Sequence, residues 1–290
     1  IYLAEAAKQF RDGWILDAIR EANEEANPGL FRLALKMATG SGKTVVMGML
    51  IAWQVLNKIA NPRNALFTDS FLIITPGITI RDRLRVLLPA DPENYYKQRD
   101  LVPHYLIDEL GSARIVITNF QAMIPREKIA AGKLTKSILG GDASGAFIET
   151  PAQMVRRVCR ELGQDRPVIV INDEAHHCYR HKQEAEEGEE LRGEERKEAE
   201  DREEAARIWI SGVEAVRDTL GLKAVYDLSA TPFFLRGSGY KEGTLFPWVV
   251  SDFSLIDAIE CGIVKVPRVP VADTAMTGEM PVYRNLWKYI

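Results

Sequence analysis

Short apolar runs that suit β-strands recur along this chain, and longer amphipathic stretches separate them. The runs are RLALKM (32–37), SFLIIT (70–75), ARIVIT (113–118), PVIVIN (167–172) and KAVYDLS (223–229). Helical periodicity lies between them, at residues 43–58, 80–88, 151–162 and 205–219. Runs that are apolar on both faces suit parallel strands covered by helices on both sides. The pattern predicts an α/β fold with a doubly wound, mostly parallel sheet.

The composition fits a globular protein and restricts its partners. The net charge of this chain is −4, so it does not bind nucleic acid through an overall positive charge as a histone does. Local clusters of hydrogen-bond donors could still contact nucleic acid. Cys159, Cys178 and Cys261 are odd in number and form no CxxC pair, so neither a disulfide framework nor a zinc ribbon is expected. No uncharged run approaches the ~20 residues of a membrane span. We therefore expect a cytoplasmic protein.

Two segments interrupt the alternation of strands and helices. Residues 127–150 are rich in glycine and small polar residues, which predicts a long surface loop. Residues 184–205 have almost no apolar content and mostly acidic charge. This composition is typical of a solvated helix or of a disordered insertion, and the sequence leaves both open.

The segment MATGSGKT, residues 37–44, joins the first predicted strand to the first predicted helix. A glycine-rich turn at a helix start presents backbone N–H groups and a positive helix end, and both favour phosphate. Lys43 adds an ammonium for the β- and γ-phosphates, and Thr44 adds a hydroxyl that can coordinate Mg²⁺. A lysine at a helix N-terminus opposes the helix dipole, so an anionic ligand explains it better than packing does. The residues predicted to bind the phosphates of ATP are Ala38, Thr39, Gly40, Ser41, Gly42, Lys43 and Thr44.

A second acidic motif, in VIVINDEAHH, follows the fourth predicted strand. Asp173 stands where a magnesium carboxylate is expected, and Glu174 is suited to position or deprotonate water. An Asp-Glu pair can instead cap a helix. However, the string DEAH arises by chance on the order of once in 10⁵ positions. We predict Lys43, Asp173 and Glu174 as catalytic residues, with Thr44 and Asp173 holding Mg²⁺.

These two motifs, together with LSATP at 228–232, resemble the first motor domain of DEAH-type superfamily-two helicases and translocases. The resemblance covers nearly the whole chain and implies a RecA-like P-loop NTPase domain. It also implies that the nucleotide state is coupled to the rest of the domain through His176, Ser229, Ala230 and Thr231. The segments IITPGITIRDRL and IVITNFQAM resemble the motifs that contact the backbone of the tracking strand. The implied nucleic-acid contacts are Thr75, Pro76, Arg81, Thr118 and Asn119, which suit phosphates rather than base edges.

MATGSGKT, INDEAHHCY and the run from Trp248 to Val271 most resemble the helicase subunit of type III or related restriction enzymes. The resemblance implies an ATP- and Mg²⁺-dependent DNA motor, with a modification or specificity subunit as a further partner. The alternative is a nucleotide-gated RNA helicase or a nucleic-acid-binding module that does not translocate. A small-molecule P-loop kinase is disfavoured because it leaves LSATP unexplained.

The resemblance also suggests a domain plan. Residues 1–267 are expected to form the first RecA-like ATPase domain, with 184–205 as a charged insertion. Residues 268–290 are expected to begin the crossing to a second motor domain that is absent. Such second domains supply an arginine finger, so the isolated chain is expected to be a nearly inactive ATP hydrolase.

Two further groups of residues are candidate binding sites. Gln9 is a candidate for adenine recognition, although an exposed helical glutamine is the better explanation. His176, His177, Cys178 and His181 lie close in sequence, as zinc ligands often do. A structural zinc site needs four suitably spaced ligands, and His104, the remaining histidine, has no such setting. We therefore do not expect zinc.

Overall fold

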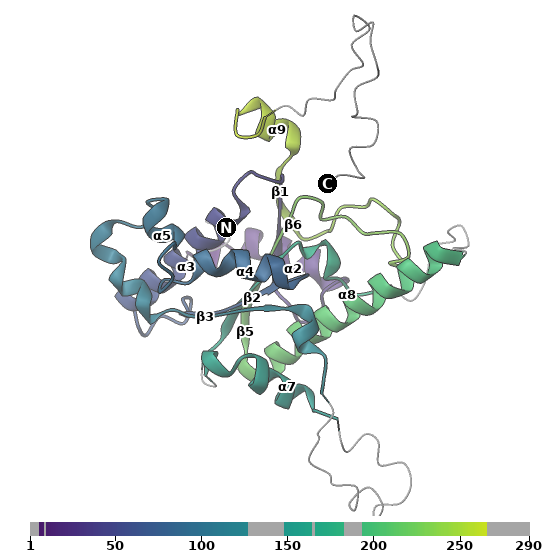
Figure 1. The fold of residues 1–290 in the computed structure, drawn as a ribbon, viewed down its shortest axis with the longest axis horizontal. Helices are drawn as coiled ribbons and strands as arrows, with labels where there is room; N and C mark the ends of the chain where they lie inside the picture. Colours follow the sequence, from purple (N-terminus) through teal and green to yellow (C-terminus); the bar gives the residue numbers. More distant parts are fainter. Residues whose placement is uncertain (1–5, 9, 127–147, 164–165, 183–192, 266–290) are drawn as a thin grey trace, which may run out of the picture.

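The computed structural model describes residues 6–8, 10–126, 148–163, 166–182 and 193–265 (Figure 1). Six strands form one sheet, with the order β3-β2-β4-β5-β1-β6 and every neighbouring pair parallel. They are β1 (Arg32–Met37), β2 (Ser70–Thr75), β3 (Arg114–Asn119), β4 (Val168–Asp173), β5 (Leu222–Ser229) and β6 (Val249–Phe253). The predicted doubly wound parallel sheet is confirmed, and five strands lie within one residue of their predicted bounds.

Helices cover both faces of this sheet. Figure 1 shows α3 and α8 on opposite sides of it, and α7 packs beside α8. The α-helices of the described ranges are α2 (Gly13–Glu24), α3 (Lys43–Ala60), α4 (Ile78–Arg83), α5 (Tyr95–Gln98), α7 (Pro151–Val158), α8 (Gly193–Leu220) and α9 (Leu255–Glu260).

The two-sided core follows from the alternation of side chains along each strand. On β2, Phe71 and Ile73 pack in the cluster that includes α3, whereas Leu72 and Ile74 pack in the cluster that includes Trp209 of α8. All four strand residues are fully buried. Burying an apolar side chain of this size stabilises a fold by roughly 1.5–3 kcal/mol. Continuous apolar runs such as SFLIIT are therefore sandwiched between two helical layers.

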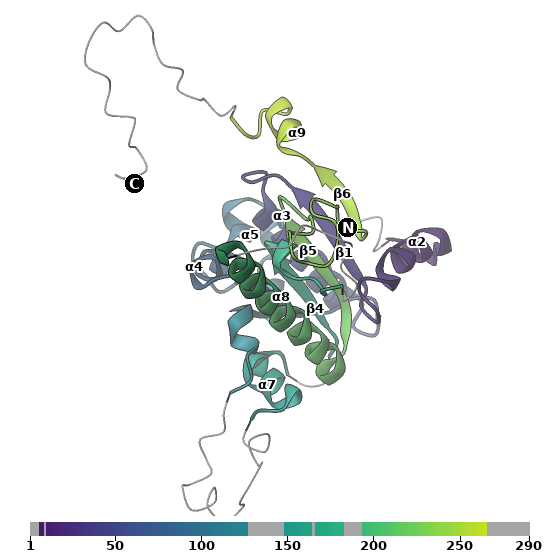
Figure 2. The same ribbon diagram turned by 90° about the vertical axis from the view of Figure 1, so that its right-hand side faces the viewer.

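Strand β6 was not predicted from the sequence. It pairs with β1 at the edge of the sheet, and its middle residues Val250, Ser251 and Asp252 are exposed. A half-exposed edge strand does not need a continuous apolar run, so the sequence signal is weak. After β6 the chain enters α9, which stands away from the sheet in both views (Figures 1 and 2).

Several helices differ in extent from the predicted ranges. The helix predicted at 80–88 is α4 followed by a 3₁₀ turn at Leu84–Leu87, and the one predicted at 151–162 is α7 followed by a 3₁₀ turn at Arg160–Leu162. Helix α8 begins at Gly193, so residues 193–205 of the acidic segment are helical; Arg196 and Glu200 pair one turn apart at 2.8 Å and support it. The remaining residues of that segment, and residues 127–147 of the predicted loop, lie outside the described residues.

Because all six strands are parallel, their carboxyl ends meet at one edge of the sheet. The segments that follow β1, β4 and β5 carry the three motifs MATGSGKT, DEAH and LSATP. Strand β5 lies between β1 and β4. Ligands of open α/β sheets bind at this edge.

Candidate active site

The loop between β1 and α3 has the backbone shape of an anion-binding turn. Gly40 and Gly42 have φ angles of 80° and 100°, in the left-handed region that favours glycine. Gly42 is the N-cap of α3, and Lys43 and Thr44 are the first two residues of that helix. The loop therefore directs the positive end of an 18-residue helix toward the carboxyl edge of the sheet.

Hydrogen bonds from a side chain and from the backbone hold this loop. The hydroxyl of Ser41 donates to the carbonyl of Ala38 at 2.7 Å and closes the turn. The amide of Ala38 donates to the carbonyl of Phe253 at 2.9 Å, so the end of β6 anchors the start of the loop. Thr39, at the tip, is exposed. The unpredicted edge strand is thus part of what shapes the loop.

Lys43 reaches across the end of β5 to the acidic motif. Its Nζ lies 2.5 Å from Oε1 of Glu174, and the two side chains are 13% and 29% exposed. Glu174 follows β4 and adopts the left-handed conformation, with φ 51° and ψ 49°. This conformation costs a non-glycine residue roughly 1–2 kcal/mol and is concentrated at functional sites. The fold thus holds a strained acidic residue against the lysine of the glycine-rich loop.

Asp173 is the last residue of β4 and is 7% exposed. Its Oδ1 is buried and has no hydrogen-bond partner among the described residues. Burial raises the pKa of its carboxyl group to about 6, and the nearby Lys43 opposes this shift. Buried polar atoms are nearly always satisfied, so an orphaned carboxylate oxygen suits a ligand for a cation such as Mg²⁺.

His176 connects the acidic motif to the segment after β5. It lies in a 3₁₀ turn at Ala175–His177, and its Nδ1 is 2.9 Å from the hydroxyl of Ser229. That hydroxyl accepts a hydrogen bond from the amide of Thr231 at 3.1 Å. Burial, helped by the neighbouring His177, lowers the pKa of His176 to about 4. At neutral pH the imidazole is therefore uncharged, and its Nδ1 can accept a hydrogen bond from the hydroxyl of Ser229. Ala230 lies between the two hydroxyl residues and is half-buried.

Acidification should destabilise the wild-type protein more than a His176→Gln variant. The pKa of His176 is about 4 in the fold against an ordinary value of 6.5, so the unfolded chain binds the proton first as pH falls. Stability is lost across this window, between pH 6.5 and 4. Glutamine cannot be protonated there but retains an acceptor for Ser229. The measurement is Tm at about pH 7.5 and about pH 5. The pKa of Asp173 is raised in the fold, so its protonation stabilises both proteins as pH falls. The difference between the two drops in Tm therefore reports His176. An equal drop in Tm in the wild type and the variant would contradict the assignment.

The candidate nucleic-acid residues gather at the ends of β2 and β3. Thr75 is paired with Asn119 in the register of these strands, which places Thr118 and Pro76 close by. The hydroxyl of Thr75 is already used, because it donates to the carbonyl of Gly77 at 2.9 Å.

Arg81 projects from α4, beyond the end of β2. It pairs with the neighbouring Asp82 at 2.9 Å and is 41% exposed. The structure thus brings the five candidates to one edge of the sheet, with Arg81 as the exposed cation among them.

The candidate zinc ligands have other neighbours. Nε2 of His181 is 3.0 Å from the carbonyl of Gly237, and Sγ of Cys178 lies 3.8 Å from the amide nitrogen of Asn172. Burial raises the pKa of the Cys178 thiol to about 12. Among the described residues no three His, Cys, Asp or Glu side chains form a metal cluster. Gln9, the candidate for adenine recognition, lies outside the described residues.

Three polar residues inside the predicted strands, Arg32, Asn172 and Asp227, were not recognised as functional from the sequence. All three are fully buried, and Asp227 accepts hydrogen bonds from both Arg32 and Asn172. Their signal was present, because charged residues are rarely buried unless they are paired. What the sequence does not carry is which strands lie side by side.

A comparison with known proteins identifies the family to which the chain is similar. The family model described as "Type III restriction enzyme, res subunit" matches residues 14–234, about three quarters of the chain. The matched region includes all three motifs at the carboxyl edge of the sheet. No curated protein matches the chain. In the described ranges no helix has the length and apolar character to cross a membrane.

Proposed function

Because this chain belongs to the family of type III restriction enzyme res subunits, whose domain is helicase-like, we propose that it is an ATP-dependent DNA motor domain. The observation that carries the proposal is the meeting of Lys43 with Glu174 at 2.5 Å, beside the orphaned oxygen of Asp173. Phosphate-binding cation, water-positioning acid and metal carboxylate are the parts that phosphoryl transfer to water requires. The DEAH motif after β4 and the LSATP motif at the end of β5 support the same assignment.

In this proposal the loop at 38–44 binds the β- and γ-phosphates through its backbone and Lys43. Thr44 and Asp173 would hold Mg²⁺, which would neutralise negative charge on the phosphate oxygens. Asp173 suits this role because its buried Oδ1 has no hydrogen-bond partner in the described ranges. A cation there also stabilises the ionised form of a carboxyl group whose pKa burial has raised.

Glu174 orients the attacking water and accepts its proton. Its Oε1 shares the ammonium of Lys43, and Oε2 lies 3.6 Å from Nδ1 of His176. A phosphate bound at the loop competes for the same ammonium and frees one carboxylate oxygen for water. The left-handed backbone of Glu174 keeps the side chain directed at this place rather than along the strand.

His176 and Ser229 transmit the occupancy of the site to the segment after β5. Their hydrogen bond joins the turn that carries Glu174 to the segment that holds Ala230 and Thr231. A shift of the turn on nucleotide binding therefore moves that segment with it. We also propose that residues 1–267 form one RecA-like motor lobe, acting with a modification or specificity subunit; residues 268–290 lie outside the described residues.

Binding to duplex DNA should be independent of sequence and should weaken as salt rises, because the proposed contacts are to phosphates. Arg81→Ala should weaken binding and reduce its salt dependence by about one counterion. Arg85→Ala is the matched control, since Arg85 lies one turn further on, is 69% exposed and pairs with Asp91 at 3.7 Å. Fluorescence anisotropy of a labelled duplex at about 50 and about 200 mM salt measures both effects.

The same assay separates the two classes of partner. An affinity for duplex DNA that does not change with salt would contradict the phosphate contacts assigned to Arg81 and its neighbours. Binding to single-stranded RNA but not to duplex DNA would favour the alternative, a nucleotide-gated RNA helicase or binding module. The family match favours DNA, since its description names a restriction enzyme.

A further inference from the structure

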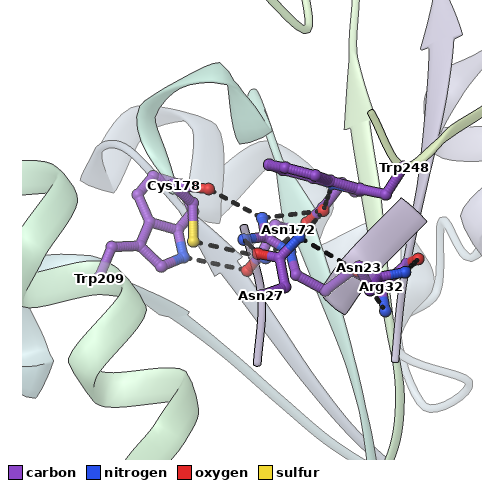
Figure 3. A network of polar contacts seen from close by, with 8 residues as sticks. Asn23, Asn27, Arg32, Asn172, Cys178, Trp209 and Trp248 are labelled. Carbon is purple, nitrogen blue, oxygen red and sulfur yellow. Dashed lines mark hydrogen bonds and ion pairs between the residues drawn. The ribbon is translucent and has the colours of Figure 1, made fainter. Parts of the chain in front are cut away.

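A fully buried polar network lies beneath the acidic motif (Figure 3). At its centre is Arg32, the first residue of β1, whose side chain is 0% exposed. Its guanidinium donates to Asp227 of β5 at 2.8 Å, to Oδ1 of Asn27 at 2.9 Å and to the carbonyl of Cys178 at 2.8 Å. The indole of Trp248 covers its face, 4.7 Å from ring centre to guanidinium carbon. A permanently charged side chain is thus enclosed by partners.

Asp227 connects Arg32 to the strand that carries the acids. Its Oδ2 also accepts a hydrogen bond from Nε1 of Trp248 at 2.8 Å, and its Oδ1 accepts one from the amide of Asn172 at 2.8 Å. The other end of that amide, Oδ1 of Asn172, accepts from Nε1 of Trp209 on α8 at 3.0 Å. Both ends of the Asn172 side chain are therefore held.

The network contacts the acidic motif on both flanks. Asn172 immediately precedes Asp173, and Cys178 follows Glu174 by four residues. Strand β5 also binds this segment further along, where Ser229 contacts His176 at 2.9 Å. The turn from Asp173 to His177 is thus fixed before, after and from the side.

Asp173 needs such support because its own Oδ1 makes no hydrogen bond to the part of the chain that the structure describes. The position of its carboxylate is set by its backbone, and hence by the groups that hold the residues around it. Glu174, in a strained backbone conformation, depends on its surroundings in the same way. A buried ion pair is an inefficient way to add stability, because apolar side chains of similar size often do as well or better. What the pair does provide is a fixed geometry.

We propose that Arg32 and Asp227 are positioning residues that hold the turn at 173–177 so that Asp173 presents its free oxygen to the Mg²⁺ of the bound nucleotide. This inference rests on the proposed function. It assigns a role to β1 and β5 beyond forming the sheet. Groups that orient metal ligands from behind typically change metal affinity or activity by about 10–100-fold when they are altered.

The test compares the affinity of the whole chain for a fluorescent ADP analogue in Mg²⁺ and in EDTA. Asp227→Asn preserves side-chain size but removes the charge that faces Arg32. We expect the gain in affinity from Mg²⁺ to fall by roughly tenfold. Affinity in EDTA, set by Lys43 and the glycine-rich loop, should stay near the wild-type value. If Asp227 acted on stability alone, the substitution would lower Tm but leave the ratio of the affinities in Mg²⁺ and in EDTA unchanged.

Val168→Ala is the matched control, because it removes buried methyl groups at the opposite end of β4, away from the network. It should lower Tm and leave the Mg²⁺ gain unchanged. Trp248→Phe removes one donor to Asp227 and should reduce the gain in the same direction, by less. This milder variant retains a test if Asp227→Asn fails to fold.

The double variant Arg32→Met/Asp227→Leu separates positioning from stability. It replaces the buried pair with apolar side chains, which should restore much of the Tm, but it cannot hold Asn172 or the Cys178 carbonyl. We expect its Mg²⁺ gain to stay low. A gain that returned with Tm, or a wild-type gain in folded Asp227→Asn, would overturn the inference and leave the proposed function intact. A wild-type protein without any Mg²⁺ gain would overturn both.

Discussion

Lys43→Ala should reduce the affinity for Mg–ATP by at least a hundredfold. Two unit charges about 4 Å apart interact with roughly 4 kcal/mol at an effective dielectric near 20, and about 1.4 kcal/mol corresponds to a tenfold change in affinity. The side chain of Lys43 is 13% exposed, so solvent screens it only in part. Its position at the start of α3 adds the helix end to the same anion site. Isothermal titration with ATP and Mg²⁺ measures the effect directly.

The matched control for this variant is Lys58→Ala, at the other end of the same helix. Lys58 donates to the carbonyls of Pro62 and Asn64, far from the glycine-rich loop. It should change ATP affinity little while removing the same charge from the protein. If Lys43→Ala bound ATP as tightly as the wild type, the loop at 38–44 would be only a structural bend.

Much of the sheet was predictable because its strands are buried on both faces. A strand such as VIVIN must be apolar at every position to be covered by helices on two sides, and this pattern is visible without any structure. Strand β6 lacked the pattern because Ser251 and Asp252 face solvent at the sheet edge. The order of the strands was not predictable, since periodicity does not identify pairing partners. The sequence left open whether α8 extends through the acidic segment, because the first half of this helix carries almost no apolar residues; residues 193–205 are helical.

The candidate site, like the sheet, could be predicted only in part from the sequence. The meeting of Lys43 with the acidic motif follows from the parallel sheet, in which the ends of β1 and β4 lie at one edge. The left-handed backbone of Glu174 and the orphaned oxygen of Asp173 required coordinates, because both depend on the turn after β4. The ion pair of Arg32 with Asp227 required the knowledge that β1 and β5 are neighbours. Sequence motifs thus identify the groups that face the ligand better than those that support them.

In the full-length enzyme, Glu174→Gln should lower ATP turnover by about 10²–10⁴-fold, the usual contribution of a general base, without loss of binding. The amide matches the carboxylate in shape but cannot accept a proton from water. Binding should be retained or become tighter, because Lys43 loses a competing anion 2.5 Å from its Nζ. Glu174→Gln should therefore weaken stabilisation of the transition state but not binding of ATP, whereas Lys43→Ala should weaken binding itself. Steady-state phosphate release measures the turnover, and titration with ATP measures the affinity.

Glu149→Gln is the control for this last variant. Glu149 is also ion-paired, to Arg157 at 2.8 Å, and is 15% exposed, but it lies before α7 and away from the loop at 38–44. Its loss should cost some stability and leave turnover per folded molecule unchanged. Equal turnover in Glu174→Gln and the wild type would show that another group activates water. Equal loss of ATP binding in Glu174→Gln and Lys43→Ala would instead mean that the pair acts as one structural unit, and the separate roles proposed for the cation and the acid would be wrong.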